Sequence, residues 1–94
     1  MAEIVIYTKP WCGYCWRAKR LLDAKGASYN EIDVTDDATQ EAEMINRSGS
    51  TTAPQIFVDG EHLGDSDHIM MLERDGKLDS ILGVATSGAA DGGE

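Results

Sequence analysis

The chain contains two cysteines, Cys12 and Cys15, in a position that permits only a few kinds of site. They follow the run EIVIY at 3–7, whose β-branched and apolar residues, ended by Thr8 and Pro10, predict a buried strand. They precede a stretch in which apolar residues recur at helical spacing. The pair is therefore expected where a strand gives way to a helix. Two thiols held there can form half of a zinc site or a pair that makes and breaks a disulfide.

The helix predicted after the strand gives the first cysteine reactive surroundings. It runs from Cys12 to Lys25 and ends at Gly26. Its buried face is predicted to consist of Cys15, Ala18, Leu21, Leu22 and the stem of Lys25. A sulfur at the first helical position meets unpaired backbone N–H groups and the positive end of the helix dipole, and Lys9 adds positive charge. Both effects favour the thiolate of Cys12, which is the form that attacks disulfides.

The second cysteine is suited to a different role. Cys15 lies three residues further on, one turn deeper on the same helical face, so it can reach the sulfur of Cys12 while being less exposed. We therefore predict that Cys12 is the nucleophile and that Cys15 is the resolving thiol.

A zinc site is the weaker interpretation of the pair. Zinc usually takes four protein ligands, and only His62 and His68 remain beyond the two cysteines. They lie in a predicted hairpin and a predicted helix rather than at zinc-finger spacing. A Cys-x-x-Cys within a strand-helix-strand pattern favours redox chemistry. No metal ligand set is therefore expected, and both histidines are expected at or near the surface.

The remaining sequence predicts an α/β fold. Strands are expected at 28–34, 54–58 and 61–64, the last two joined by an Asp59-Gly60 turn, and helices at 35–47, 65–72 and 77–83. The first two strands should be parallel because a helix joins them, and the hairpin should be antiparallel. The result is a four-stranded mixed sheet, in the order βαβαββα with a short extra helix, covered by helices on both faces. One domain is expected over 1–83, and the glycine-rich residues 84–94 predict a flexible tail.

Charge and composition exclude several functions. The net charge is −9, with 17 acidic against 8 basic residues, so binding to nucleic acid is not expected. Five of the basic residues lie within 1–30, around the cysteines, which fits either a solvated helix face or a field that attracts a small anion. The chain has no apolar stretch long enough to span a bilayer and too few cysteines for a secreted disulfide framework. We therefore expect a cytoplasmic protein without a membrane partner.

Three motifs in order carry a family resemblance. The segments YTKPWCGYC at 7–15, TTAPQIFVDG at 51–60 and LGDSD at 63–67 make the chain similar to the dithiol glutaredoxins, and among them to the bacterial glutaredoxin 3 group. Thioredoxins share the Trp-Cys-Gly, but they have proline where this chain has Tyr14. The resemblance implies a thioredoxin-like fold. It also implies a glutathione-dependent oxidoreductase that reduces glutathione mixed disulfides and protein disulfides, in which ribonucleotide reductase is one candidate substrate.

The resemblance further implies a site for glutathione. The implied binding residues are Lys9, Tyr14, Thr52, Ala53, Pro54, Ser66 and Asp67, with Arg47 as an additional candidate. Pro54 would be a cis-proline facing the thiols, so that the backbone of Ala53 pairs with the tripeptide as a short added strand. The N–H groups of Ser66 and Asp67 would hold the γ-glutamyl carboxylate, and the Asp67 carboxylate would take the ammonium. Lys9 would meet the glycine carboxylate.

The chain departs from the family pattern at three places. It has Ala53 where valine is common, Ser50-Thr51 where a basic residue often precedes the Thr-Val-Pro, and Asp65 where the family has a second glycine. Asp65 puts a negative charge beside a site for an anion, so it is expected to weaken glutathione binding.

Two alternative functions stay open at this point. Gly13, a small residue after the first cysteine, resembles glutaredoxins that form dimers bridged by a [2Fe-2S] cluster, in which Cys12 and glutathione supply the thiolates. Otherwise a monomer is expected. The less favoured alternative is a redoxin recharged by thioredoxin reductase, against which Lys9, Tyr14 and the Ser66-Asp67 pair argue.

Overall fold

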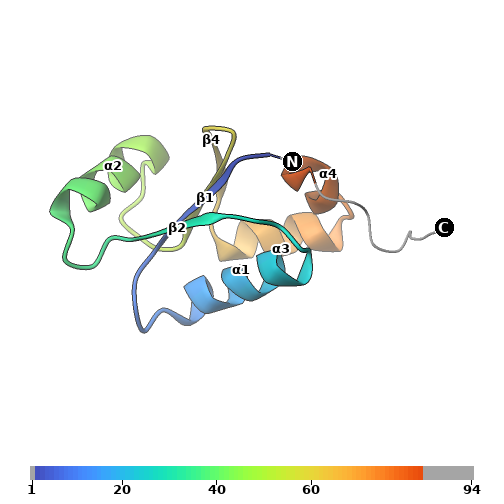
Figure 1. Ribbon diagram of the computed structural model, residues 1–94, viewed down its shortest axis with the longest axis horizontal. Coiled ribbons are helices and arrows are strands. Elements are labelled where there is room, and N and C mark those ends of the chain that lie inside the picture. Colours follow the sequence, from blue (N-terminus) through green and yellow to red (C-terminus); the bar gives the residue numbers. More distant parts are fainter. Residues whose placement is uncertain (1, 84–94) are drawn as a thin grey trace.

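The computed structural model describes residues 2–83 and has the predicted order of elements (Figure 1). In chain order these are β1 (Ile4–Thr8), α1 (Gly13–Ala24), β2 (Asn30–Asp33), α2 (Ala38–Ser48), β3 (Gln55–Val58), β4 (Glu61–Gly64), α3 (Ser66–Arg74) and α4 (Leu78–Leu82). The tail predicted at 84–94 lies outside the described residues. Within residues 2–83, no helix has the length and apolar character needed to cross a membrane.

The four strands form one mixed sheet in the order β2-β1-β3-β4. The first two strands are parallel, as expected for a pair connected by α1, and β3 runs antiparallel to both β1 and β4. The hairpin turn between β3 and β4 has positive φ angles of 52° at Asp59 and 84° at Gly60, which the Asp-Gly pair tolerates. Figure 1 shows α1 and α3 together on one side of the sheet and α2 away from them.

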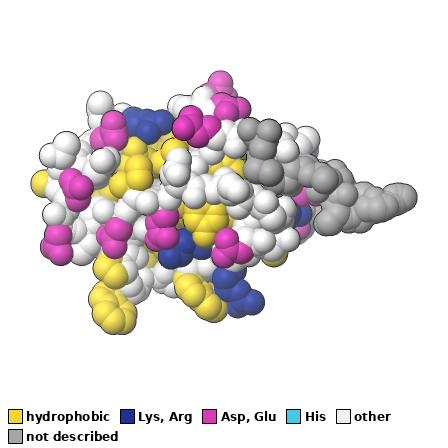
Figure 2. Space-filling view, viewed as in Figure 1, with side chains coloured by type: hydrophobic (Ala, Val, Ile, Leu, Met, Phe, Trp, Pro, Cys, Tyr) yellow, Lys and Arg dark blue, Asp and Glu magenta, His cyan; other side chains and the backbone are white. Residues whose placement is uncertain are grey.

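The surface carries its charge unevenly. In the view of Figure 2, acidic side chains are spread over the face, whereas hydrophobic side chains protrude from the lower edge, where α1 lies in Figure 1. Basic side chains stand beside one of these hydrophobic groups. In this view, basic and apolar side chains therefore lie together at that edge.

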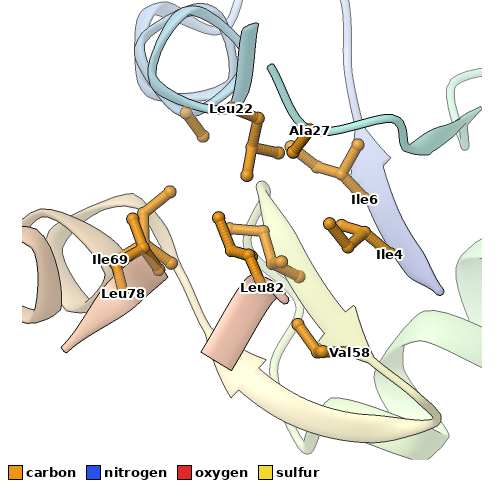
Figure 3. Close-up of a cluster of buried hydrophobic side chains, with 10 residues drawn as sticks. Ile4, Ile6, Leu22, Ala27, Val58, Ile69, Leu78 and Leu82 are labelled. Atoms are coloured by element: carbon orange, nitrogen blue, oxygen red, sulfur yellow. The ribbon is translucent and has the colours of Figure 1, made fainter. Parts of the chain in front are cut away.

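The alternation of side chains along β1 and β3 divides the core into two parts. Ile6 faces the side of α1, α3 and α4, where Figure 3 shows it near Leu22, and Ile69 belongs to the same cluster. On the other face, Tyr7 and Phe57 pack with α2, their ring centroids 5.6 Å apart and their planes at 82°. Successive residues of a strand point to opposite faces, so a sheet covered on both sides needs apolar residues at consecutive positions. That explains why the run at 3–7 does not alternate with polar residues.

Candidate active site

Cys12 is the N-cap of α1, one residue before the helical position predicted for it. Its Sγ accepts a hydrogen bond from the backbone N–H of Cys15 at 3.2 Å, in the way that an N-cap serine or aspartate oxygen does. The same sulfur lies 3.6 Å from the carbonyl oxygen of Ala53, to which the protonated thiol can donate. The two contacts suit the two protonation states of Cys12, since the thiolate needs a donor and the thiol needs an acceptor.

Cys15 lies on the buried face of α1, as predicted, and only 2% of its surface is exposed. Burial raises the pKa of the Cys15 thiol to about 12, and its hydrogen bond to Cys12 acts in the same direction, against the opposing backbone contact of Lys9. Cys15 is therefore an un-ionised thiol at neutral pH. Cys12, which is partly exposed, is the sulfur that a substrate can reach.

This difference predicts selective alkylation. Treatment of the reduced protein with iodoacetamide between about pH 7 and 9 should modify Cys12 and leave Cys15 untouched, because only a thiolate reacts and Cys15 titrates well above that range. Peptide mapping by mass spectrometry locates the adduct, and the pH dependence of the rate reports the thiolate of Cys12. Modification of Cys15 in the folded protein at the same rate as Cys12 would contradict the assignment.

A pocket of about 350 Å³ is lined by Ala53, whose carbonyl oxygen the Cys12 sulfur contacts. Its lining consists of Tyr14, Thr52, Ala53, Pro54, Asp65, Ser66 and Asp67. These residues come from the start of α1, the loop before β3 and the start of α3, so three segments far apart in sequence meet there. The peptide bond between Ala53 and Pro54 is cis, as the resemblance implied. The volume falls within the range of small-molecule sites.

A polar network around the buried Gln55 holds the loop before β3. Gln55, which is 3% exposed, donates from Nε2 to the carbonyl oxygen of Thr52 at 2.9 Å and accepts at Oε1 from His62 Nε2 at 2.7 Å. The hydroxyls of Ser50 and Thr52 are 2.8 Å apart. No role for Gln55 or His62 was predicted from the sequence. A glutamine within the apolar run PQIFV was the one sign of a buried polar contact. Both residues fix the backbone that leads to Ala53.

The start of α3 presents unused hydrogen-bonding groups to the pocket. Asp65 is the N-cap and accepts from the N–H of His68 at 3.0 Å, which leaves the N–H groups of Ser66 and Asp67 without an acceptor inside the helix. Ser66 is only 2% exposed, and its Oγ has no hydrogen-bond partner among the described residues. A buried hydroxyl without a partner costs about 1–3 kcal/mol, so a ligand that satisfies it gains affinity.

The two basic candidates are not part of the pocket lining. Lys9 Nζ lies 3.0 Å from Glu41 Oε2 of α2, with both side chains more than a third exposed. The guanidinium of Arg47 donates to the hydroxyl of Tyr7 at 2.9 Å and lies 4.2 Å from the centroid of the Phe57 ring. An exposed pair such as Lys9–Glu41 contributes about 0–1 kcal/mol, so a ligand carboxylate can compete for Lys9. Arg47, in contrast, packs α2 against Tyr7 and Phe57 of the sheet.

A thiol pair at the start of a helix, in a four-stranded thioredoxin-like sheet and beside a pocket with a cis-proline wall, defines the class of thiol–disulfide oxidoreductases. The family model named Glutaredoxin matches residues 4–63. The chain belongs to the glutaredoxin family, and it is therefore a glutathione-dependent thiol–disulfide oxidoreductase.

The relatives and solved structures agree with this assignment. Glutaredoxin 3 of Escherichia coli is 49% identical over 82 residues, which cover 87% of this chain and 99% of that protein. The solution structure of glutaredoxin from Brucella melitensis is 51% identical with a TM-score of 0.78, over 87% of this chain and 89% of that one. A buckwheat glutaredoxin–glutathione complex is 36% identical with a TM-score of 0.79, over 87% and 77% of the two chains. The predicted fold and the predicted enzyme class are confirmed.

Proposed function

We propose that this enzyme reduces glutathione mixed disulfides through Cys12 alone and protein disulfides through Cys12 and Cys15 together. One observation carries the proposal: the Cys12 sulfur contacts the carbonyl of Ala53, and Ala53 is also part of the pocket wall. A tripeptide in the pocket would thus bring its own sulfur next to Cys12. The crystal structure of the buckwheat glutaredoxin is a complex with glutathione, which supports the identity of that tripeptide.

The first reaction uses a single cysteine of the enzyme. The Cys12 thiolate attacks the glutathione sulfur of the mixed disulfide, the target thiol leaves as a thiolate and takes a proton, and Cys12 is left bound to glutathione. The thiolate of a second glutathione then attacks that glutathione sulfur and releases glutathione disulfide and the Cys12 thiolate. Cys15 takes no part, which fits its high pKa.

The second reaction requires Cys15. The Cys12 thiolate attacks a protein disulfide, and the resulting mixed disulfide is broken when the Cys15 sulfur attacks Cys12, its proton passing to the departing protein thiolate. Once Cys12 is part of a disulfide, it no longer holds the Cys15 thiol by a hydrogen bond or repels its anion, two effects that raise the pKa of Cys15. Burial remains the largest effect and keeps the pKa of Cys15 raised.

The orientation of glutathione follows from the polar groups of the pocket. The N–H groups of Ser66 and Asp67 and the unpartnered Ser66 hydroxyl would hold the γ-glutamyl carboxylate, and the Asp67 carboxylate would hold the adjacent ammonium. The backbone of Ala53 would pair with the central cysteine, and Tyr14 and Thr52 would flank it. At the far end, Lys9 would leave Glu41 and meet the glycine carboxylate.

Asp65 is expected to weaken this binding. It lies in the pocket wall, where its negative charge opposes the carboxylate that Ser66 and Asp67 would hold. The Asp65→Gly variant should lower the KM for glutathione about fivefold, equivalent to about 1 kcal/mol in a solvated site. The Asp65→Asn variant, which keeps a capping side chain, separates the charge from the loss of the cap, since glycine at an N-cap costs only a few tenths of a kcal/mol. An unchanged KM in both variants would refute the effect.

Coupled assays test the proposed function directly. With a glutathionylated protein as substrate, the enzyme should turn over when glutathione, glutathione reductase and NADPH are supplied, and not when thioredoxin reductase and NADPH replace them. Turnover with thioredoxin reductase alone would favour the other recharging system. A supply of reduced glutathione is found in the cytoplasm, which is where we place the reaction.

A cluster-bridged dimer is a second candidate function, and the surroundings of Gly13 favour it. A Cβ added to Gly13 would meet no atom within 4 Å, so the chain next to the exposed side of Cys12 is open to a second copy. Within residues 2–83, no three His, Cys, Asp or Glu side chains are grouped to bind a metal, so Cys12 would need thiolates from outside the chain. Visible absorbance of anaerobically purified protein, lost when glutathione is removed, would support this role.

A further inference from the structure

An exposed surface on α1 stands out next to the active site. Among residues 2–83, the large hydrophobic side chains that are exposed include Trp11 at 100%, Tyr14 at 57% and Trp16 at 59%, all within four residues of Cys12. Figure 2 shows hydrophobic groups protruding from the edge of the molecule where α1 lies. Apolar rings gathered in water beside a reactive group are typical of a surface that meets a partner.

Two arginines extend this surface along the helix. The Cζ atom of Arg20 lies 4.8 Å from the centroid of the Trp16 ring, and that of Arg17 lies 5.8 Å from the Tyr14 ring. Both distances are within the range of cation–π contacts, which restrict the guanidinium groups without using their N–H donors. We call Trp16, Arg17 and Arg20 the α1 docking surface.

The arginines of the α1 docking surface keep their charge available. Lys9, Lys19 and Lys25 each form an ion pair with a carboxylate of the chain, whereas Arg17 and Arg20 form none among the described residues. The protein as a whole carries −9, so two uncompensated guanidinium groups form a local positive site on an acidic molecule. Such a site attracts an acidic partner and repels a basic one.

The shape of the surface connects it to the active site. A hollow of about 360 Å³ is lined by Gly13, Tyr14, Trp16 and Arg17. Tyr14 also belongs to the wall of the proposed glutathione pocket, so the pocket and this hollow share Tyr14 as a lining residue. A second hollow, about 300 Å³ in volume, continues past Arg17 to Arg20. A mixed disulfide could therefore place its glutathione on one side of Tyr14 and its protein chain on the other.

We propose that the α1 docking surface binds an acidic segment that flanks the glutathionylated cysteine of a protein substrate. The inference rests on the proposed function, because it assumes that Cys12 attacks a glutathione mixed disulfide. It adds substrate selection: Arg17 and Arg20 pair with the carboxylates of the segment while Trp16 covers its apolar stems. Substrates with basic flanks are disfavoured.

Peptides provide the test. Two peptides carry one S-glutathionylated cysteine each, flanked by glutamates in one and by lysines in the other. Their kcat/KM values are compared at about 0.01 M salt, where charges are weakly screened, and at about 1 M salt, where they are strongly screened. The full chain should prefer the acidic peptide by about tenfold or more at low salt, and the ratio should fall toward one at high salt. An equal kcat/KM for both peptides at low salt overturns the proposal.

Variants locate the preference on the surface. Arg17→Gln combined with Arg20→Gln should bring the ratio of the two peptides close to one, and Trp16→Ala should reduce kcat/KM for the acidic peptide. The matched control is Arg74→Gln combined with Lys77→Gln, which removes the same charge from exposed residues at and beyond the C-terminal end of α3, opposite the end that lines the pocket. The control should keep the wild-type ratio. An equal loss of the ratio in the control pair would assign the preference to net charge and overturn the proposal.

Two further measurements separate the possible failures. The mixed disulfide of glutathione and 2-mercaptoethanol contains no peptide that could bind the α1 docking surface. If the wild type does not turn over this substrate, the proposed function is refuted rather than the docking surface. Sedimentation of the wild type and the Trp16→Ala variant tests a second copy as the occupant. Self-association that depends on Trp16, without any peptide preference, would replace the proposal by a dimer interface.

Discussion

The Cys12→Ser variant is expected to lose at least about a thousandfold in turnover of both glutathione mixed disulfides and protein disulfides, because a serine hydroxyl is not ionised at neutral pH and cannot replace the attacking thiolate. The Cys15→Ser variant should keep the first activity and lose the second. The reason is structural: Cys12 alone is partly exposed and contacts the pocket wall, whereas Cys15 is buried behind it.

The two variants control one another. Both remove one sulfur from the start of α1, so a general loss of folding would lower both activities in both variants, and circular dichroism measures it separately. The expected pattern is a split between substrates in one variant only. Substantial turnover by the Cys12→Ser enzyme, or loss of mixed-disulfide turnover in the Cys15→Ser enzyme, would overturn the assignment of nucleophile and resolving thiol.

A Gly64→Ala substitution should strongly destabilise the fold. Gly64 ends β4 with a φ of 135°, and a Cβ there would lie 2.8 Å from the Cβ of His68. That atom is attached directly to the backbone of α3, so no rotation of the histidine removes the clash and the helix itself must move. Backbone strain and overpacking together should cost about 2–4 kcal/mol in the free energy of unfolding.

The same substitution should also weaken glutathione binding. The first residues of α3, Ser66 and Asp67, are part of the pocket wall, so a shift of the helix displaces the groups proposed to hold the γ-glutamyl carboxylate. The KM for glutathione should rise about tenfold, which corresponds to about 1.4 kcal/mol. Urea unfolding and steady-state kinetics measure the two effects.

Gly60→Ala is the matched control for this prediction. Gly60 also has a positive φ, 84°, but an added Cβ would meet no atom within 4 Å. Its replacement should cost about 1 kcal/mol from backbone conformation alone and leave the KM unchanged. A Gly64→Ala enzyme as stable as the Gly60→Ala enzyme would show that the contact with His68 does not matter. Adding His68→Gly to the Gly64→Ala variant should restore the KM if it does.

Local sequence was enough to predict most of the fold. The EIVIY run and the Asp59-Gly60 turn each have a short-range cause, and each appears in the structure as expected. The error at Cys12 was also local: a cap and a first helical residue differ by one position, and the pattern of apolar residues does not separate them. The flexible tail at 84–94 stays a prediction.

The network behind the loop before β3 could not be predicted in the same way. Gln55 and His62 lie on paired strands, and only the register of β3 against β4 brings their side chains to 2.7 Å. The sequence shows a polar residue in an apolar strand but not the hydrogen-bond partner that offsets the cost of burying it. The ion pair of Lys9 with Glu41 likewise depends on where α2 packs.

By itself, the sequence determined the order of the elements, the pair of cysteines at the start of a helix and the family, because these follow from local propensities and from motifs that are contiguous in the chain. Only the tertiary structure decided that Lys9 and Arg47 lie outside the lining of the pocket that Tyr14, Ala53 and Ser66 share. It also decided that Arg17 and Arg20 keep their charge while Lys9, Lys19 and Lys25 are paired. Exposure and pairing depend on contacts between segments far apart in the chain, and those contacts exist only after the sheet and its helices have packed.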